Sequence, residues 1–395
     1  MIGLCASDEC TGCAGCYNSC PVDAISMVEN RWGEIVPDIH PDLCTECGRC
    51  VRACPILTPC NLAEPTGCYA AWASDASDAL LSSSGGVAAV FAGHIIRSGG
   101  LAVGAVLTEA LVPQHVIAGT RTCAESFRGS KYVQSEIGLV YREVGEHLDS
   151  GARVLFTGTP CQVAGLRGYL GTDHENLITV DIVCHGVPPA AYLHAHVQDI
   201  LGTDAKGPVR LTFRDDGAFR LRLSDSSKVL YSSGWVRDAY YYSFMKGITY
   251  RECCYGCRFA TPMRSSDITL GDFWGLDKRS LGVSHDGRVS LILVNSGKGL
   301  DYVQEIGGAL YREERCVSEA IAGNPQLRCP AKRHPKRARF RAAYPTLGFA
   351  GAIRRSGVQA EVRVAAIKDA APYQTLRAVI HRLSSVFVAF RSGRV

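Results

Sequence analysis

The N-terminal part of the chain reads Cys10-Thr-Gly-Cys13-Ala-Gly-Cys16-Tyr-Asn-Ser-Cys20-Pro21 and, after a gap, Cys44-Thr-Glu-Cys47-Gly-Arg-Cys50-Val-Arg-Ala-Cys54-Pro55. Both runs follow the pattern C-x2-C-x2-C-x3-C-P, with which bacterial ferredoxins wrap the chain around 4Fe–4S clusters. In two-cluster ferredoxins, the fourth cysteine of each run binds the cluster of the other run. We therefore expect one cluster on Cys10, Cys13, Cys16 and Cys54, and a second on Cys44, Cys47, Cys50 and Cys20.

Other uses of these cysteines explain the pattern less well. A structural zinc site takes four ligands, commonly as two short pairs, and does not require eight cysteines in two identical runs. Disulfides are typical of exported proteins, and nothing in the sequence indicates export. Cys5, Cys60 and Cys68 have no partner at cluster spacing, so we treat them as spare thiols.

The composition indicates a globular protein with an unusual amount of sulfur. The 395 residues are 47% hydrophobic and 20% charged, which leaves room for two or three domains. The 19 cysteines are clustered, which favours metal binding in a reducing compartment. No signal peptide is visible, and no uninterrupted apolar stretch reaches the roughly 18 residues of a membrane span. We therefore expect a cytoplasmic protein without a transmembrane segment.

Basic residues are concentrated toward the C-terminus. Residues 331–395 hold 14 Lys and Arg against 2 Asp and Glu, so the rest of the chain is acidic. Apolar residues recur there at helical spacing: Leu376, Val379, Ile380, Leu383, Phe387 and Phe390. A basic amphipathic helix of this kind suits a membrane surface or a partner protein. We prefer a helix packed on the acidic body, and the absence of a nucleic-acid-binding motif argues against a nucleic-acid role.

A second domain is expected to begin near Cys68. Residues 69–73 predict a short strand, residues 87–96 a helix, and residues 101–107 a buried strand. The turn Ser82-Ser83-Ser84-Gly85-Gly86 precedes this helix and suits an anion such as a flavin phosphate, although most such turns only cap a helix. No G-x-G-x-x-G follows the strand, so a standard dinucleotide-binding fingerprint is absent.

Two further cysteines are expected at one edge of a sheet. Residues 153–156 and 177–183 read as buried strands, and residues 163–170 between them read as a helix. Strands in a β-α-β unit run parallel, and ligands of such sheets bind beyond the carboxyl ends of the strands. Cys161 and Cys184 directly follow these two strands, so both thiols are predicted to lie on that edge.

A possible third cluster uses these two thiols together with a C-x2-C pair. Cys254 and Cys257 have the spacing of metal ligands, and we hypothesise that they join Cys161 and Cys184 around a third 4Fe–4S cluster. Other interpretations stay open at this point. Cys161 near a helix start suits a low-pKa reactive thiol, Cys184 suits a small buried apolar residue, and the C-x2-C pair suits zinc with other ligands.

The middle of the chain resembles a known family, the beta subunit of coenzyme F420 hydrogenase/dehydrogenase. The resemblance covers roughly residues 68–340 and is carried, in order, by Ser83-Ser-Gly-Gly86, Gly129-Ser-Lys-Tyr-Val133, Gly158-Thr-Pro-Cys-Gln162, Cys184-His-Gly186, Cys254-Tyr-Gly-Cys257 and Arg264-Ser-Ser-Asp-Ile-Thr-Leu-Gly-Asp-Phe-Trp-Gly275. The last stretch and the one at 158–162 are the most specific of these motifs. An N-terminal dicluster domain is a form that this family takes.

The resemblance implies an oxidoreductase with FAD and iron–sulfur clusters. Family members pass electrons between the reduced deazaflavin coenzyme F420, clusters, and a hydrogenase partner or ferredoxin. The resemblance favours the third cluster and makes Ser84, Gly85, Gly86, Lys131 and Thr159 candidates for a flavin site, although each also suits a turn or surface position. Two other functions remain: a ferredoxin-driven reductase of a small organic molecule, and a non-catalytic electron-transfer subunit of a larger complex.

The expected architecture has three parts. Residues 1–60 form a small dicluster ferredoxin-like domain of α+β type, and residues 68–330 form a larger α/β flavin-binding domain with a mainly parallel central sheet. Residues 331–395 form a basic helical extension.

Overall fold

The computed structural model describes residues 3–202, 209–215 and 217–370. Its largest sheet has eight strands, in the order β13 (Leu310–Glu314), β3 (Gly67–Ala73), β12 (Ser290–Val294), β11 (Ile268–Asp272), β7 (Leu177–Ile182), β6 (Val154–Gly158), β4 (Leu101–Leu107) and β5 (Pro113–Ala118). The four central strands β11, β7, β6 and β4 run parallel. The remaining pairings are antiparallel, so the sheet is mixed.

The prediction of a mainly parallel sheet is therefore wrong at both sides of the sheet. A short loop joins β4 to β5, and so short a connection can only make an antiparallel hairpin. On the other side, β3 pairs with β12 and β13, which come from far along the chain. The predicted β-α-β unit is present: helix α7 (Pro160–Leu170) joins β6 to β7, and these two strands are parallel.

Helices cover both faces of this sheet, which explains why its strands read as continuous apolar runs. Leu155 and Ile178 pack on one face with helices α4 (Val87–Arg97) and α10 (Gly297–Glu305). Phe156 and Leu177 pack on the opposite face with α7 and α6 (Val140–Asp149). The short helices α3 (Ala76–Leu80), α5 (Arg121–Glu125) and α11 (Val317–Gly323) complete this part of the fold.

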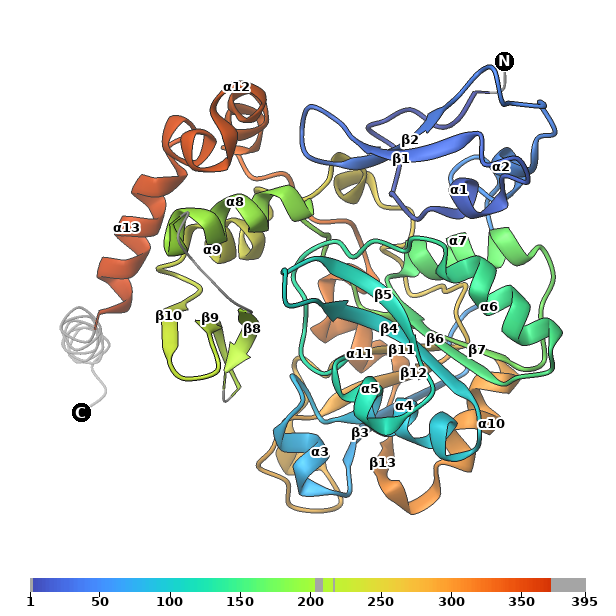
Figure 1. Cartoon of the computed structure of the whole chain (residues 1–395). Helices are drawn as coiled ribbons and strands as arrows, with labels where there is room; N and C mark the ends of the chain where they lie inside the picture. The colour runs from blue at the N-terminus through green and yellow to red at the C-terminus, as the bar shows by residue number, and fades with distance from the viewer. Residues whose placement is uncertain (1–2, 203–208, 216, 371–395) are drawn as a thin grey trace, which may run out of the picture.

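The N-terminal module lies across helix α7 (Figure 1). It consists of the antiparallel hairpin of β1 (Ile25–Glu29) and β2 (Ile35–Ile39), flanked by the short helices α1 (Gly15–Ser19) and α2 (Arg49–Arg52). Its helix α1 packs on α7, so the first cysteine run faces the edge of the main sheet where Cys161 lies.

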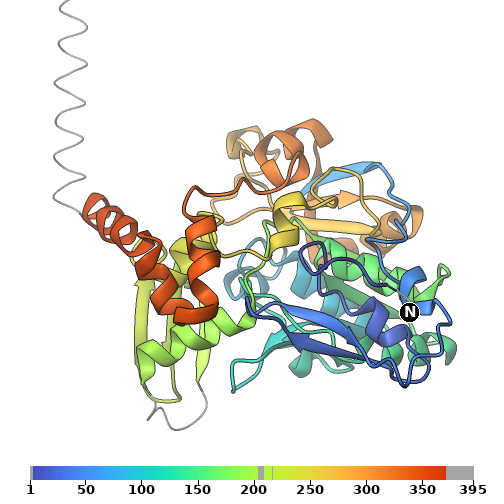
Figure 2. The ribbon, with the colours of Figure 1, turned by 90° about the horizontal axis from the view of Figure 1, so that it is seen from above.

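A second body stands beside the main sheet (Figures 1 and 2). It contains a three-stranded antiparallel sheet and four helices: β8 (Arg210–Asp215), β9 (Ala218–Ser224), β10 (Val229–Gly234), α8 (Ala190–Leu201), α9 (Ala239–Met245), α12 (Arg337–Arg355) and α13 (Val358–Asp369). Aromatic residues such as Tyr192, Tyr240, Phe340 and Phe349 form its core.

Helices α12 and α13 fall within the expected basic extension. The amphipathic helix predicted over residues 376–390 lies outside the described residues. Within the described ranges, no helix combines the length and the hydropathy that a bilayer crossing needs.

Candidate metal centres

The first cysteine run and Cys54 surround a cavity. Its lining includes Cys10, Cys13, Cys16 and Cys54, which are the four residues predicted to hold the first cluster. All four are buried, and the backbone N–H of Gly12 donates a hydrogen bond to Cys10 Sγ at 3.4 Å. Amide donors of this kind stabilise thiolates and cluster sulfur.

A second cavity lies at the other run. Its lining includes Cys20, Cys44, Cys47 and Cys50, which are the predicted ligands of the second cluster. The N–H of Ala24 donates to Cys20 Sγ at 3.1 Å, and Cys47 is exposed. The crossed assignment of the fourth cysteines, deduced from spacing, therefore coincides with the residues that line each cavity.

The two runs also adopt the same backbone conformation. In the first run Gly12 and Ala14 have positive φ angles of 66° and 60°, and at the equivalent positions of the second run Glu46 and Gly48 have φ angles of 53° and 72°. A left-handed conformation costs alanine or glutamate about 1 kcal/mol, so it is not adopted without reason. The repeated curl turns each loop around its cavity, as wrapping around a cubane requires.

Among the predicted spare thiols, Cys5 lies unexpectedly close to the first cavity. It belongs to the lining, and its sulfur stands 4.0 Å from Cys54 Sγ. The sequence gave no indication that Cys5 lies near this cavity, because Cys5 is outside the repeated cysteine spacing. Cys68 is buried within β3, and Cys60 is half-buried between the module and that strand.

The N-terminal module touches the main domain through very close backbone contacts. A Cβ atom built on Gly165 of α7 would stand 2.9 Å from Cys13 Sγ, and one on Gly168 of the same helix would stand 2.6 Å from Ala53 O. Glycine at these positions lets α1 and α7 approach until the wall of the first cavity rests on α7. Cys161 lies one turn before Gly165 on that same helix.

The structure brings the four thiols of the hypothetical third cluster to one region. Cys161 interacts electrostatically with Cys184 and Cys257, and Cys184 interacts with both Cys257 and Cys254. The N–H of Gly186 donates to Cys184 Sγ at 3.4 Å. Two of these thiols follow the parallel strands β6 and β7, as expected from topology. The other two belong to the short 3-10 helix at Glu252–Gly256 and the residue after it.

Burial argues against the interpretation of Cys161 as a reactive thiol with a low pKa. Burial has the largest effect on this thiol and raises its pKa well above the ordinary value, and neighbouring Cys184 acts in the same direction. A reactive low-pKa cysteine needs the opposite shift. Burial likewise raises the pKa of Cys184 to about 12. A raised pKa favours the neutral thiols when no metal is bound, so binding of iron would release their protons.

In the described part of the chain, no three His, Cys, Asp or Glu side chains converge as closely as the ligands of one metal ion do. Thiolates around a 4Fe–4S cubane stand farther apart, since each of them binds a different iron atom.

The segment that carries the C-x2-C pair also forms hydrogen bonds with the N-terminal module. Arg251 donates hydrogen bonds to the carbonyl oxygens of Cys10 and Ile35, both at 3.0 Å, and Arg258 donates to Ile56 O at 3.0 Å. These two arginines flank the pair, so the pair is held against the first cavity. Neither arginine was singled out by its spacing in the sequence.

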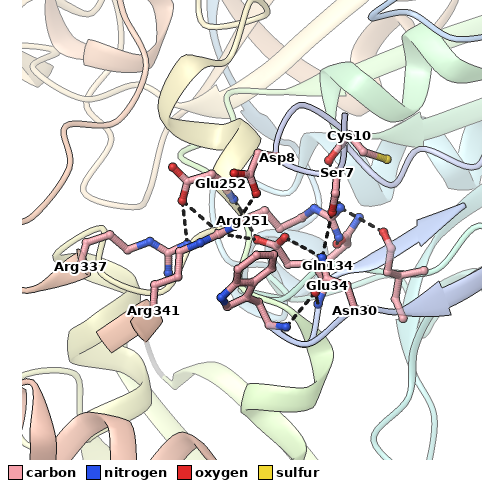
Figure 3. A network of polar contacts seen from close by, with 12 residues as sticks. Ser7, Asp8, Cys10, Asn30, Glu34, Gln134, Arg251, Glu252, Arg337 and Arg341 are labelled. Atoms are coloured by element: carbon pink, nitrogen blue, oxygen red, sulfur yellow. Dashed lines mark hydrogen bonds and ion pairs between the residues drawn. The ribbon is translucent and has the colours of Figure 1, made fainter. Parts of the chain in front are cut away.

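Helix α12 joins the same region through the polar network in Figure 3. Arg341 pairs with Glu34 at 3.4 Å and with Glu252 at 3.1 Å, and it also contacts Asp8. Arg337 pairs with Glu252 at 3.3 Å. Basic residues at the start of the extension are thus paired with carboxylates of the chain itself.

The five flavin candidates lie near one edge of the main sheet, but each has an internal partner. Gly85 N donates to Ser290 Oγ at 2.9 Å, and Ser84 Oγ accepts from the same hydroxyl at 3.1 Å. Gly86 precedes α4 with φ 87°. Lys131 Nζ donates to the carbonyls of residues 126, 127 and 128. Thr159 caps α7 and lies 3.2 Å from Cys161 Sγ.

Arg214 of β8 links the loops that carry these candidates. It donates to Ser83 O at 3.0 Å, to Tyr132 Oη at 2.9 Å and to Asp272 Oδ2 at 2.7 Å. The N–H of Ser130 donates to Ser83 Oγ at 2.8 Å, so the loops at 82–86 and 129–132 meet. The sequence placed Asp272 in a recognisable motif, but it gave no signal for Arg214.

Comparisons with known proteins match two parts of the chain. Residues 151–319 match the family model for the C-terminal part of the beta subunit of coenzyme F420 hydrogenase/dehydrogenase, and residues 9–56 match that of a 4Fe-4S dicluster domain. No curated protein matches the chain. A chain of the xenon-derivatised F420-reducing [NiFe] hydrogenase complex from Methanosarcina barkeri aligns with 15% identity and a TM-score of 0.44, over 69% of this chain and 97% of that one. Residues 151–319 therefore belong to the coenzyme F420 hydrogenase/dehydrogenase beta subunit family, and residues 9–56 are a 4Fe–4S dicluster domain.

Proposed function

We propose that this chain is an iron–sulfur flavoprotein oxidoreductase that passes electrons between a hydride-carrying coenzyme, FAD and 4Fe–4S clusters. The hydride carrier is coenzyme F420 or a similar molecule. The observation that carries this proposal is the pair of cavities, each lined by the four cysteines predicted to hold one cluster. The first of these cavities rests on the helix that bears Cys161. Iron–sulfur electron transfer also agrees with the two families that the chain matches.

We assign the ligands of the first two clusters as the spacing predicts, and those of the third as hypothesised from the sheet edge and the C-x2-C pair. Cys10, Cys13, Cys16 and Cys54 hold the first cluster, Cys44, Cys47, Cys50 and Cys20 the second, and Cys161, Cys184, Cys254 and Cys257 the third. The N–H donors to Cys10, Cys20 and Cys184 support these assignments, because each cluster then receives an amide hydrogen bond. The domain boundaries near residues 60, 68 and 330 follow from the same proposal.

The order of the clusters defines a path for electrons. Cys47 of the second cluster is exposed, so the outer end of the path is open to a redox partner such as ferredoxin. The first cluster follows the second on this path, and its ligand Cys13 contacts Gly165 of α7. The third cluster would then stand between the first and the flavin.

The flavin is proposed to bind where the loops at 82–86 and 129–132 meet. Ser84, Gly85, Gly86, Lys131 and Thr159 lie on or near these loops, and Arg214 brings a guanidinium to the same junction. A positive side chain beside the start of α4 suits a phosphate group. When bound, FAD accepts a hydride as an electron pair and releases single electrons to clusters.

A second candidate is an electron-transfer subunit without its own substrate. The family model is that of a beta subunit, which favours a role within a larger complex. In a ferredoxin-driven reductase of a small organic molecule, electrons would pass in the opposite direction, from the clusters to the flavin and then to the substrate. All described cysteines are free thiols, which supports a reducing, cytoplasmic setting.

Anaerobic purification tests the proposal. We expect about twelve irons per chain if three clusters are present, together with one FAD. Reduced F420 should then bleach the flavin and reduce the clusters in the absence of other proteins. Flavin and clusters that respond to no hydride donor, in a preparation that retains a partner protein, would instead support the subunit. Protein that contains neither iron nor flavin after reconstitution contradicts both.

A further inference from the structure

Arg251 is a buried cation that donates its hydrogen bonds mainly to backbone carbonyls and to an amide oxygen. The side chain is 1% exposed. Its guanidinium donates to Cys10 O and Ile35 O at 3.0 Å and to Gln134 Oε1 at 2.7 Å (Figure 3), while its Nε has no partner among the described residues. Gln134 in turn donates to Thr11 O at 3.0 Å, inside the first cysteine run.

The carboxylates nearby are engaged with other cations. Glu34 and Asp8 pair with Arg341, and Glu252 pairs with Arg333, Arg337 and Arg341. Within the described ranges, Arg251 forms no ion pair with any carboxylate. A buried charge without a counter-charge is costly and is rarely kept in a folded protein. No carboxylate contacts the guanidinium directly, so a further negative group close to it would be stabilising.

Thiols of two proposed clusters are among the groups that face Arg251. It interacts electrostatically with Cys253, which is in no ligand set, with Cys10 of the first cavity, with Glu34, and with Cys254 of the C-x2-C pair. The loop of the first run lies directly against it, since a Cβ built on Gly12 would stand 3.2 Å from Arg251 Cζ. Arg251 also precedes Cys254 by three residues, and the N–H of Cys254 donates to the backbone carbonyl of Arg251 at 3.1 Å. The guanidinium thus lies against the first cysteine run and within electrostatic range of one predicted ligand of the third cluster, Cys254.

We propose that Arg251 is the shared counter-charge of the first and third clusters and raises the reduction potential of both. This inference rests on the cluster assignments of the proposed function. A cluster on four thiolates is negative, and reduction adds one more negative charge. A fixed buried cation stabilises the reduced form more than the oxidised form, and solvent screens it little. None of the hydrogen-bond partners of Arg251 lines the second cavity, so the second cluster should not respond.

The test compares midpoint potentials in the full-length holoprotein by EPR-monitored redox titration. Arg251→Met removes the charge, and Arg251→Lys keeps it. Gln134→Glu leaves Arg251 in place but sets a carboxylate against it. We expect Arg251→Met and Gln134→Glu to disfavour reduction of the first and third clusters at least tenfold, which is about 59 mV for one electron. Arg251→Lys should keep most of the wild-type potential.

Arg52→Met is the matched control. Arg52 also donates to the carbonyl of a predicted ligand, Cys47 O at 3.4 Å, but it is exposed. Solvent screens such a charge, so the potential of the second cluster should move much less. Signals of the second cluster are identified by their loss in Cys47→Ser.

Two outcomes would contradict the inference. Unchanged midpoints in both charge variants, with iron content intact, would overturn it, as would an equal shift of all three clusters. If Arg251→Met fails to fold, Gln134→Glu and Arg251→Lys give the answer. Wild-type protein without iron would contradict the proposed function itself, which iron and sulfide analysis reveals before any titration.

Discussion

Gly165 of helix α7 lies so close to Cys13 that a Cβ atom at position 165 would stand 2.9 Å from the cysteine sulfur and 3.0 Å from its Cβ. This contact joins the dicluster module to the main domain at the helix that also carries Cys161. It brings the wall of the first cavity within one helical turn of Cys161.

Replacing Gly165 by alanine is expected to loosen this junction. The added methyl overlaps Cys13, and overpacking of this kind costs about 1–3 kcal/mol. The first cluster should become labile, and electron transfer from it to the main domain should slow. Stopped-flow reduction and iron loss at low chelator concentration measure both effects.

Gly93→Ala is the control for this substitution. Gly93 also lies inside an eleven-residue helix, α4, but its added Cβ would meet only the flexible end of Arg97 at 3.1 Å. Alanine should stabilise this helix by up to about 1 kcal/mol. Equal iron loss and equal reduction rates in the two variants would show that the contact with Cys13 does not stabilise the first cluster.

Substitutions at adjacent cysteines test the third cluster. Cys254→Ser should remove about four irons per chain, whereas Cys253→Ser should leave the iron content unchanged. The two residues are neighbours in the same 3-10 helix, so general damage to the segment affects both. Iron analysis with EPR of the remaining clusters provides the measurement. The reverse result would place Cys253 in the ligand set, and full iron content in both variants would refute the third cluster.

Arg214 provides a test of the flavin site. Arg214→Met removes the link between Ser83, Tyr132 and Asp272, so the loops lose both their cation and their connection. We expect FAD affinity to fall at least tenfold, equivalent to about 1.4 kcal/mol. Arg210→Met, an exposed position on the same strand, should bind FAD as the wild type does. Fluorescence titration of flavin-free protein distinguishes the two, and equal affinities would exclude this location.

The parts of the fold that the sequence predicted are those set by local spacing. The eight N-terminal cysteines were assigned to their cavities because the repeated pattern fixes the geometry within twelve-residue runs. Strands β4, β6 and β7 followed from short apolar runs. The mixed character of the sheet could not be deduced, because β3 pairs with strands that lie more than two hundred positions later, such as Ser290 with Ala71.

Arg251 and Arg214 were missed for the same physical reason. Arg251 binds Cys10 O across 241 positions, and Arg214 binds Ser83 O across 131. A single arginine has no spacing pattern, and its role arises only when the chain folds and buries it beside its acceptors. Gly165 gave no signal either, since a glycine in a helical stretch usually indicates only lower helix propensity.

Asp238 should be important for the stability of the second body. Its buried carboxylate accepts from Tyr241 N at 2.7 Å at the start of α9, and it binds His196 Nε2 at 2.8 Å and Tyr231 Oη at 2.9 Å. Burial works to raise the pKa of Asp238, but the hydrogen bond and charge of His196 lower it below the ordinary value of 3.8.

The sign of this shift fixes the condition for the measurement. A carboxyl with a lowered pKa in the folded state contributes stability above its unfolded pKa and loses it as pH falls through the folded pKa. Denaturant unfolding at pH 7 therefore reports the full contribution. Asp238→Asn should lower the free energy of unfolding by about 2–3 kcal/mol, because the amide cannot replace the charged acceptor for both His196 and the helix.

Asp225→Asn is the matched control, since Asp225 accepts the backbone N–H groups of Ser227 and Lys228 in an exposed turn. Water replaces such bonds readily, so the unfolding curve of Asp225→Asn should stay near that of the wild type. A wild-type midpoint for Asp238→Asn would mean that α9 and the small sheet do not need this carboxylate. In that case aromatic packing around Tyr240 and Phe349 would account for the cohesion of the second body.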